Sequence, residues 1–147
     1  MKNLPVEDAR ARMLTHAAAL PQEVVSLLYA DGRVLGELVD ALRAQPPFAA
    51  SAMDGWAVRS ADAPEPGARL RVVGESAAGK AYTQTLAAGE AVRIFTGAPV
   101  PAGADCVVIQ EEASRQGDEV VLQVAAGPKS NIRPEGGDFA EGDLLLR

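Results

Sequence analysis

The first part of the chain alternates apolar and polar residues with helical spacing. Five apolar residues recur three and four positions apart: Val6, Ala9, Met13, Ala17 and Leu20. This spacing predicts one amphipathic helix over residues 5–20. A proline suits its first turn, two acidic residues follow where the helix dipole is positive, and Pro21 ends it.

The pattern becomes less regular beyond residue 20. Residues 23–28 form a short apolar run that is typical of a strand. Residues 30–39 have helical spacing but contain two glycines, which predicts a short helix followed by an extended segment. Pro46 and Pro47 then interrupt the chain and indicate a boundary.

After Pro47 the chain consists of short apolar, β-branched runs separated by Gly, Pro, Asp and Ser. These runs are WAVRS (56–60), RLRVVGES (69–76), AVRIFTG (91–97), DCVVIQEE (105–112), EVVLQVA (119–125) and DLLL (143–146). Such spacing predicts short antiparallel strands in a sheet, barrel or sandwich. A hairpin turn is expected at residues 115–120, because Gly117 tolerates positive φ and Asp118 tolerates the bend. The expected fold class is therefore α+β, mostly β, with a helical and extended N-terminal arm.

Composition and charge limit the function. A chain of 147 residues fits one domain, or a small domain with part of another. The net charge of −6 argues against a nucleic-acid binder, which normally has a basic stripe. It does not exclude an anionic small ligand, because a bound Mg²⁺ or a few arginines can reverse the field inside a pocket.

The single cysteine and single histidine exclude further classes of site. No disulfide or cysteine-based zinc site can form, and a Ser-His or Cys-His pair would need the remote His16. We expect His16 to be a surface or packing residue and Cys106 to be a small buried apolar residue. No apolar stretch approaches the ~20 residues that span a membrane, and the N-terminus lacks a signal-peptide pattern, so we expect a cytoplasmic protein.

Three stretches combine turn residues with polar side chains. In PPFAASAMDGWAVRSAD (46–62), Asp54 could cap its own turn or bind a hard cation or a polar substrate group. In RIFTGAPVPAGADCVV (93–108), Thr96-Gly97-Ala98 could form an anion-binding nest or only a rigid loop. In NIRPEGGDFAEGD (131–143), Arg133 could bind an anion or pair with Glu135 or Asp138.

Taken together, these stretches resemble one family. PPFAASAMDGWAV, FTGAPVPAGADCVVIQEE and NIRPEGGDFAEGD, in this order, are similar to the N-terminal part of the molybdopterin molybdenumtransferases, the MoeA family, and to the E domain of gephyrin. The resemblance covers essentially the whole chain, and LPQEVVSLLYADGRVLGELV is similar to the segment that leads into it. The terminal run GDLLLR then suggests a strand that is cut short, although an ordinary edge strand is the alternative.

The resemblance implies a reaction and its partners. The family enzyme inserts molybdenum from molybdate into adenylylated molybdopterin, with Mg²⁺-dependent release of AMP. Its members are cytoplasmic homodimers, and the active site lies between the third domain of one subunit and the second domain of the other. A fragment without the third domain is expected to be inactive alone. Neither nucleic acid nor membrane takes part.

The resemblance also assigns roles to residues. It implies catalytic roles for the three polar residues of the motifs: Asp54, Thr96 and Asp138. Asp54 and Asp138 are the implied Mg²⁺ ligands, and cofactor-binding roles fall to Ser51, Gly97 and Ala98. The chain departs from the family at Ala49-Ala50, where a polar pair is common, and at Gly137, where an acidic residue is frequent.

The resemblance also implies how the chain is divided into domains. Residues 1–20 form a helix that would pack on the third domain, 21–46 belong to domain I, 47–138 form the β-rich domain II, and 139–147 form a truncated return strand of domain I. The alternative function is a non-catalytic β-rich module for dimerisation or scaffolding. A third reading is a structural β-domain in which the three motifs are only turns.

Overall fold

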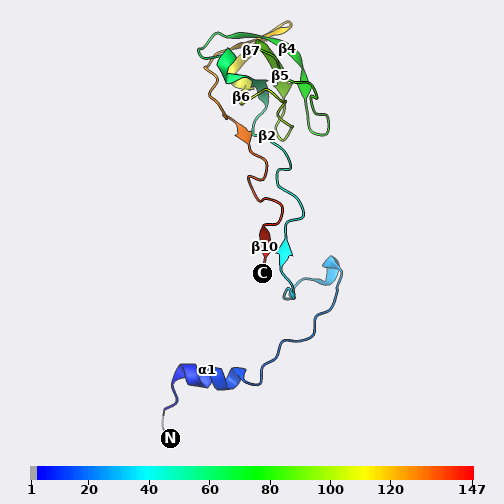
Figure 1. Ribbon diagram of the computed structural model, residues 1–147, viewed down its shortest axis with the longest axis vertical. Helices are drawn as coiled ribbons and strands as arrows, with labels where there is room; N and C mark the ends of the chain where they lie inside the picture. Colours follow the sequence, from blue (N-terminus) through cyan, green and yellow to red (C-terminus); the bar gives the residue numbers. More distant parts are fainter. Residues whose placement is uncertain (1–2) are drawn as a thin grey trace. The chain divides into compact units, whose positions relative to one another are not determined.

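The structure is a computed structural model that describes residues 3–147. The chain divides into two compact units (Figure 1): one extends to Leu38 and includes Arg147, and the other is Val39–Leu146. Among the described residues, no helix has the length and apolar character that a membrane crossing requires.

The first unit contains one α-helix, α1 (Val6–Leu14), in which no residue is buried. The predicted helix over residues 5–20 was therefore too long. The hydroxyl of Thr15 donates to the carbonyl of Ala11 at 2.9 Å where the helix ends. Most helical stability in proteins comes from packing of the apolar face, and within this unit the apolar stripe of α1 packs on nothing that buries it.

The expectations for residues 23–39 were also wrong in part. The run at 23–28 forms no strand, and the only helical turn nearby is η1 (Leu27–Tyr29), in which the Leu28 amide donates to the hydroxyl of Ser26. No helix forms at 30–38, where Gly32 adopts a φ of 74°. A residue in this left-handed region cannot continue a right-handed helix, so the turn ends there. The chain becomes extended only at Val39.

The second unit is built around a curled six-stranded half-barrel sheet (Figure 1), which confirms the mostly β prediction. The strand order is β6-β3-β5-β4-β8-β7. The bounds are β3 (Gly55–Val58), β4 (Arg69–Ser76), β5 (Glu90–Ile94), β6 (Cys106–Ile109), β7 (Ala113–Gln116) and β8 (Glu119–Leu122). Two short 3₁₀ turns flank them: η2 (Ser60–Asp62) and η3 (Gln110–Glu112).

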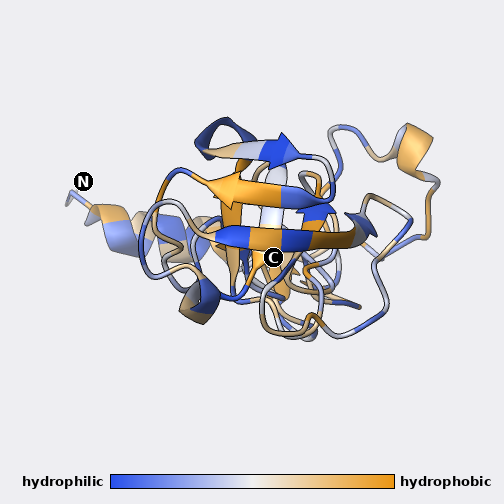
Figure 2. Ribbon diagram, turned by 90° about the horizontal axis from the view of Figure 1, so that it is seen from above, coloured by the Kyte–Doolittle hydropathy of each residue, from blue (hydrophilic) through white to orange (hydrophobic). Residues whose placement is uncertain are grey.

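Both faces of the sheet carry apolar side chains at its centre. All four residues of β3 are buried: Trp56 and Val58 belong to one apolar cluster, and Ala57 to the other, with Val92 and Ile94 of β5. Orange, apolar stretches and blue, polar ones alternate along the strands in Figure 2. Strands buried on both faces read as continuous apolar runs, which is why the sequence located them well.

The topology differs from the expected antiparallel arrangement at one pair. β4 and β5 are parallel, whereas the other neighbours in the sheet are antiparallel. Residues 77–89 join β4 to β5, and a parallel pair needs a crossover of about a dozen residues or more. The β7–β8 hairpin is as predicted, with Gly117 at a φ of 65°.

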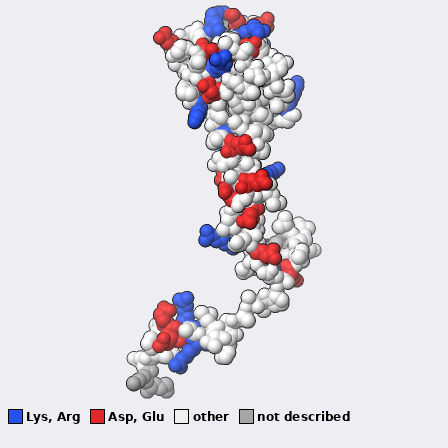
Figure 3. Space-filling view, viewed as in Figure 1, with Lys and Arg blue, Asp and Glu red and all other residues white. Residues whose placement is uncertain are grey.

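Two paired segments lead away from the sheet. β2 (Ala50–Ser51) pairs with β9 (Ile132–Arg133), and β1 (Val39–Asp40) pairs with β10 (Leu144–Leu146). Backbone hydrogen bonds between residues 41–46 and 136–143 continue the pairing. Acidic side chains predominate along this part of the surface in Figure 3. The pairing brings residues 39–46 and 139–146 together, while the domain boundaries at 46/47 and 138/139 stay predictions.

Candidate functional site

Asp54 lies in the tight turn between β2 and β3. Ser51 fixes this turn, because its hydroxyl, which is buried, donates to the carbonyl of Met53 at 2.6 Å. Gly55 follows and has no room for a side chain: a Cβ there would lie 2.0 Å from the carbonyl oxygen of Val108 on β6. The turn is therefore anchored on both sides of Asp54.

Thr96 lies just beyond the end of β5 and binds Asp54 through two groups. Its backbone amide and its hydroxyl both donate to Oδ1 of Asp54, each at 2.7 Å. The second oxygen, Oδ2, accepts no hydrogen bond from the described part of the chain. The structure thus joins the first two sequence motifs through one carboxylate that keeps a free oxygen.

This contact determines the charge of Asp54. The Thr96 amide, then the Thr96 hydroxyl, lower the pKa of the carboxyl below its ordinary value, and the Arg93 charge adds a smaller effect. Partial burial opposes them but does not reverse the direction. A carboxylate that accepts hydrogen bonds in its ionised form is held in that form, so Asp54 is an anion at neutral pH.

An open hollow lies beside this contact. It has a volume of about 230 Å³ and is lined by five residues: Met53, Asp54, Thr96, Gln110 and Glu111. The last two come from η3, and the amide of Gln110 donates to the carbonyl of Asp54 at 3.0 Å. No role was predicted for them from the sequence, although they directly follow the apolar run of β6. Polar residues at the end of a buried strand, QEE after CVVI, are the signal that would have found them.

Asp138 lies elsewhere. Its carboxylate pairs with Arg133 at 2.5 Å, and its amide donates to the carbonyl of Gln45 at 2.8 Å. It does not line the hollow beside Asp54. The structure therefore brings together two of the three predicted catalytic residues, and the role of Asp138 stays a prediction.

The predicted anion nest is already filled by the protein itself. The amides of the Thr96-Gly97-Ala98 loop donate to Asp54 Oδ1, to the carbonyl of Ser51 and to the carbonyl of Phe95, respectively. Since all three amides have acceptors, the anion that this loop holds is the Asp54 carboxylate. Cofactor-binding roles for Ser51, Gly97 and Ala98 stay predictions.

The carboxylates of the hollow can be tested for fit to Mg²⁺. Asp54 and Glu111 both line it, but within residues 3–147 no three His, Cys, Asp or Glu side chains are grouped closely enough to hold a metal ion. Mg²⁺ commonly uses one or two carboxylates together with water and substrate phosphates. The described residues therefore provide no complete Mg²⁺ site by themselves, and the Mg²⁺-binding role of Asp54 stays a prediction. Asp138, the second ligand implied by the resemblance, is paired with Arg133 instead.

Comparison with known proteins decides the family. Residues 4–147 match the MoeA N-terminal region, domain I and II. The chain belongs to this family. The MoeA assignment confirms the resemblance seen in the sequence, and it implies a role in molybdenum cofactor biosynthesis.

Several molybdopterin molybdenumtransferases are similar to this MoeA chain. The Haemophilus influenzae protein is 35% identical over 97% of this chain, and a Mycobacterium tuberculosis molybdopterin molybdenumtransferase 2 is 41% identical over 83%. They are covered over only 36% and 31% of their own length, so the chain spans about a third of these relatives. A crystal structure of a molybdopterin biosynthesis MoeA protein from Pyrococcus horikoshii aligns with a TM-score of 0.80 at 31% identity, covering 99% of this chain and 38% of that one.

The Asp54–Thr96 contact makes a prediction about pH. In Thr96→Val we expect the pKa of Asp54 to rise toward its ordinary value, because Val removes the hydroxyl donor. A depressed carboxyl pKa stabilises the folded state above the pKa of the unfolded chain, and that stabilisation is lost as pH falls through the folded value. Unfolding below about pH 4 should therefore depend less steeply on pH in the variant. Carboxyl ¹³C shifts followed by NMR during acid titration measure the pKa of Asp54 in the wild type and in the variant.

The chain offers a matched control for this titration. The Asp105 carboxylate accepts the Ser60 amide at 2.6 Å and the Ser60 hydroxyl at 2.7 Å, and these bonds likewise lower its pKa. Thr96→Val should leave Asp105 unchanged, whereas Ser60→Ala should shift Asp105 and leave Asp54 unchanged. An unaltered Asp54 titration in Thr96→Val would show that the Thr96 hydroxyl does not lower the pKa of Asp54.

Proposed function

We propose that this chain forms the domain I and II part of a molybdopterin molybdenumtransferase. The enzyme would insert molybdenum from molybdate into adenylylated molybdopterin and release AMP in a Mg²⁺-dependent step, in the cytoplasm. The observation that carries the proposal is the hydrogen-bonded contact between Asp54 and Thr96 at an open hollow. It places residues of two separate sequence motifs side by side in the lining of that hollow.

The charge of the site constrains how its residues act. Molybdate, the pyrophosphate link and the dithiolene are all anionic, so an ionised Asp54 would repel them directly. Asp54 would therefore help to hold a divalent cation with its carboxylate, or it would accept a hydrogen bond from a hydroxyl or amine of the substrate. When bound, Mg²⁺ would neutralise phosphate charge and polarise the bond to the adenylyl group. Thr96 orients the carboxylate by occupying Oδ1.

A chimera tests the proposal. This chain would replace the aligned N-terminal region of the Haemophilus influenzae relative, to which it is 35% identical. We expect the purified chimera to convert adenylylated molybdopterin and molybdate into molybdenum cofactor with release of AMP. The unaltered relative is the positive control. A chimera that is folded and dimeric like the relative but releases no AMP would contradict the proposal.

The chain alone is expected to bind the substrate weakly. It spans about a third of its relatives, and the hollow is open and lined by two carboxylates. A drug-sized ligand normally buries most of its surface in its pocket. Calorimetric titration with adenylylated molybdopterin should therefore detect no binding, or binding far weaker than to the chimera. Equal affinity for the chain and the chimera would contradict this expectation, because the rest of the chimera would then add nothing to substrate binding.

A second candidate function is supported by the first unit. Apolar side chains there are strongly exposed, among them Leu20, Val24, Leu27, Leu28 and Val34. Apolar side chains exposed to this extent favour association with another surface, which agrees with a non-catalytic dimerisation or scaffolding module. Sedimentation over a range of concentrations separates the two candidates when read with the chimera assay: a scaffold would self-associate, and its chimera would lack activity.

A further inference from the structure

Arg93, on β5, contacts the hollow-lining residue Gln110 without lining the hollow itself, and its guanidinium is held from several directions. Its guanidinium carbon is 5.4 Å from the ring centre of Trp56 and 4.7 Å from that of Phe95. Nη1 donates to the carbonyl of Gly55 at 3.0 Å, and Nη2 donates to Oε1 of Gln110 at 2.7 Å. A planar guanidinium suits this position, because it can stack on aromatic rings and donate in two directions at once.

The partners of Arg93 are neutral. Within residues 3–147 it makes no ion pair, whereas Arg69, Arg71 and Arg133 each pair with a carboxylate. The charge of Arg93 is therefore not neutralised by a contacting carboxylate. It contributes to the lowered pKa of Asp54. A cation held by neutral groups against aromatic rings keeps a fixed position and a fixed field beside the hollow.

The contact with Gln110 fixes the direction of an amide. Arginine can only donate, so it binds Oε1 of Gln110, and this leaves Nε2 to donate to Oε1 of Glu111 at 3.1 Å. Gln110 and Glu111 both line the hollow, and Arg93 does not. Arg93 thus reaches the hollow through two links: Gln110, and the Gly55 carbonyl next to Asp54.

We propose that Arg93 is a positioning residue of this site: it orients Gln110 and the Asp54–Gly55 turn without contacting the substrate itself. The proposal rests on the function proposed above. Outer residues that orient ligating side chains commonly change activity by about 10- to 100-fold when they are replaced. Arg93 should have an effect of this size although it lies outside the hollow.

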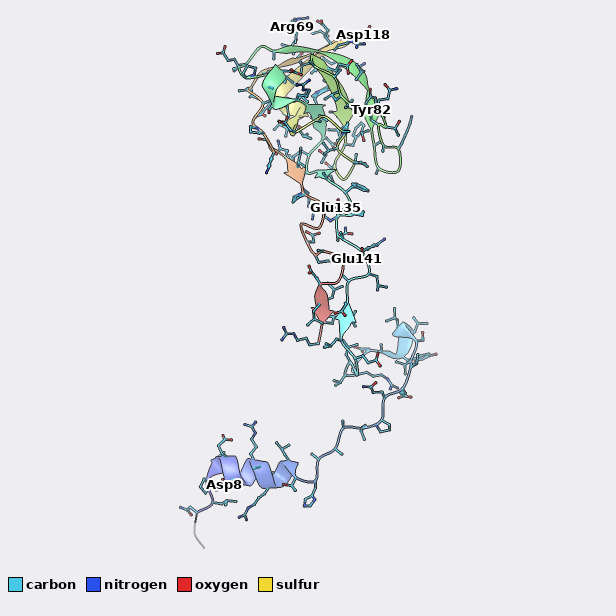
Figure 4. The ribbon with its side chains drawn as sticks, viewed as in Figure 1. Asp8, Arg69, Tyr82, Asp118, Glu135 and Glu141 are labelled. Atoms are coloured by element: carbon cyan, nitrogen blue, oxygen red, sulfur yellow. The ribbon has the colours of Figure 1, made fainter. Side chains whose placement is uncertain are left out.

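A similar contact elsewhere in the sheet, between β4 and β7, provides the control. Nη2 of Arg69 on β4 donates to Oε1 of Gln116 at 3.3 Å and pairs with Glu119 at 2.7 Å. Figure 4 shows Arg69 and Asp118 at one end of the second unit, away from Glu135 and Glu141 on the paired segments. Arg69 and Gln116 repeat the same kind of contact where no site is proposed.

The first experiment measures the order of the Gln110 side chain by NMR in this 147-residue chain. The amide resonances are assigned by their loss in Gln110→Met, and their ¹⁵N heteronuclear NOE reports rigidity. We expect a rigid Gln110 amide in the wild type and loss of rigidity in both Arg93→Met and Arg93→Lys. Methionine removes the donors, and a lysine ammonium cannot reproduce the planar guanidinium that donates to Gly55 and Gln110 at once. Arg69→Lys should leave Gln110 unchanged. A rigid Gln110 amide in Arg93→Lys would overturn the proposal.

The second experiment measures kinetics in the chimera. Arg93→Met should lower kcat by about 10- to 100-fold with KM for adenylylated molybdopterin within about twofold. Arg93→Lys should behave similarly. Gln110→Met, at an exposed position, should lower kcat, though by no more than Arg93→Met does, and the double variant should be no worse than Arg93→Met. Arg69→Met should match the wild type.

The outcomes separate the two proposals. Wild-type kcat in Gln110→Met, or additive losses in the double variant, would overturn the positioning role while the proposed function stands. A chimera that is inactive with the unaltered chain would count against the proposed function, and the amide measurement on the chain itself then decides the role of Arg93.

Discussion

Asp54→Ala in the chimera is expected to abolish molybdenum insertion, with a loss of about 100-fold or more. The substitution removes both carboxylate oxygens of a residue that lines the hollow: Oδ1, which accepts from Thr96, and Oδ2, which accepts no hydrogen bond from the described residues. Cofactor formed per unit time measures the loss, and AMP release followed in parallel shows which half of the reaction fails.

The variant should stay folded. Asp54 is near the surface, and the turn around it is also held by the Ser51 hydroxyl and by the Gln110 amide. Asp118→Ala, at the exposed β7–β8 turn, is the matched control and should keep full activity. Asp54→Asn keeps the size of the side chain and removes its charge, so it separates a need for shape from a need for the anion. Wild-type cofactor yield from Asp54→Ala would remove Asp54 from the mechanism.

Gly55→Ala is expected to destabilise the second unit by about 3 kcal/mol or more. An added Cβ would meet the carbonyl oxygen of Val108 at 2.0 Å and its carbon at 2.9 Å. These are backbone atoms of the neighbouring strand β6, so they cannot rotate away as a side chain would. The β3–β6 pairing would have to open where it supports Asp54 and Gln110. Thermal unfolding should show a midpoint lower by about 10 °C.

Gly89→Ala is the control for this substitution. Gly89 has a φ of 74°, but a Cβ there meets nothing within 4 Å. Its cost should be that of a left-handed residue alone, about 1–2 kcal/mol. If the two variants lose equal stability, the close approach of β6 is not what requires glycine at position 55.

The strands of the second unit could be predicted because their signal is local. The run at 69–76 corresponds to β4, and the run at 91–97 overlaps β5 but extends past its end at Ile94. The turn at Gly117 follows from its need for positive φ. The parallel pairing of these two strands could not be predicted in this way. It depends on where the chain between them crosses, and the apolar pattern of a strand does not encode the direction of its neighbour.

The site was predictable to the extent that its residues stood in recognisable motifs. Asp54 and Thr96 were named, and they touch; Gln110, Glu111 and Arg93 were not. Arg93 lies inside an apolar strand run, where the sequence alone suggests an outward-facing residue. Its role depends on side chains that only the folded sheet brings beside it. Asp138 is the opposite case. It stands in a recognisable motif, but in the structure its carboxylate pairs with the nearby Arg133 and does not line the hollow.

The first unit was predicted least well. The helical spacing over residues 5–20 is present, but only Val6–Leu14 is helical. The pattern records which face would be buried, and it says nothing of whether a partner surface lies within the same chain. Where no such contact exists, propensity alone decides the length of the helix, and a helix shorter than about 12–15 residues is marginal in water.

The position of Trp56 gives the protein an optical reporter of its own. It is the only tryptophan of the chain, it is 5% exposed on β3, and it lies under the guanidinium of Arg93. Its fluorescence emission therefore describes the half-barrel alone, because the first unit contains no tryptophan. The melting of one unit can be recorded separately from the other, without any attached label.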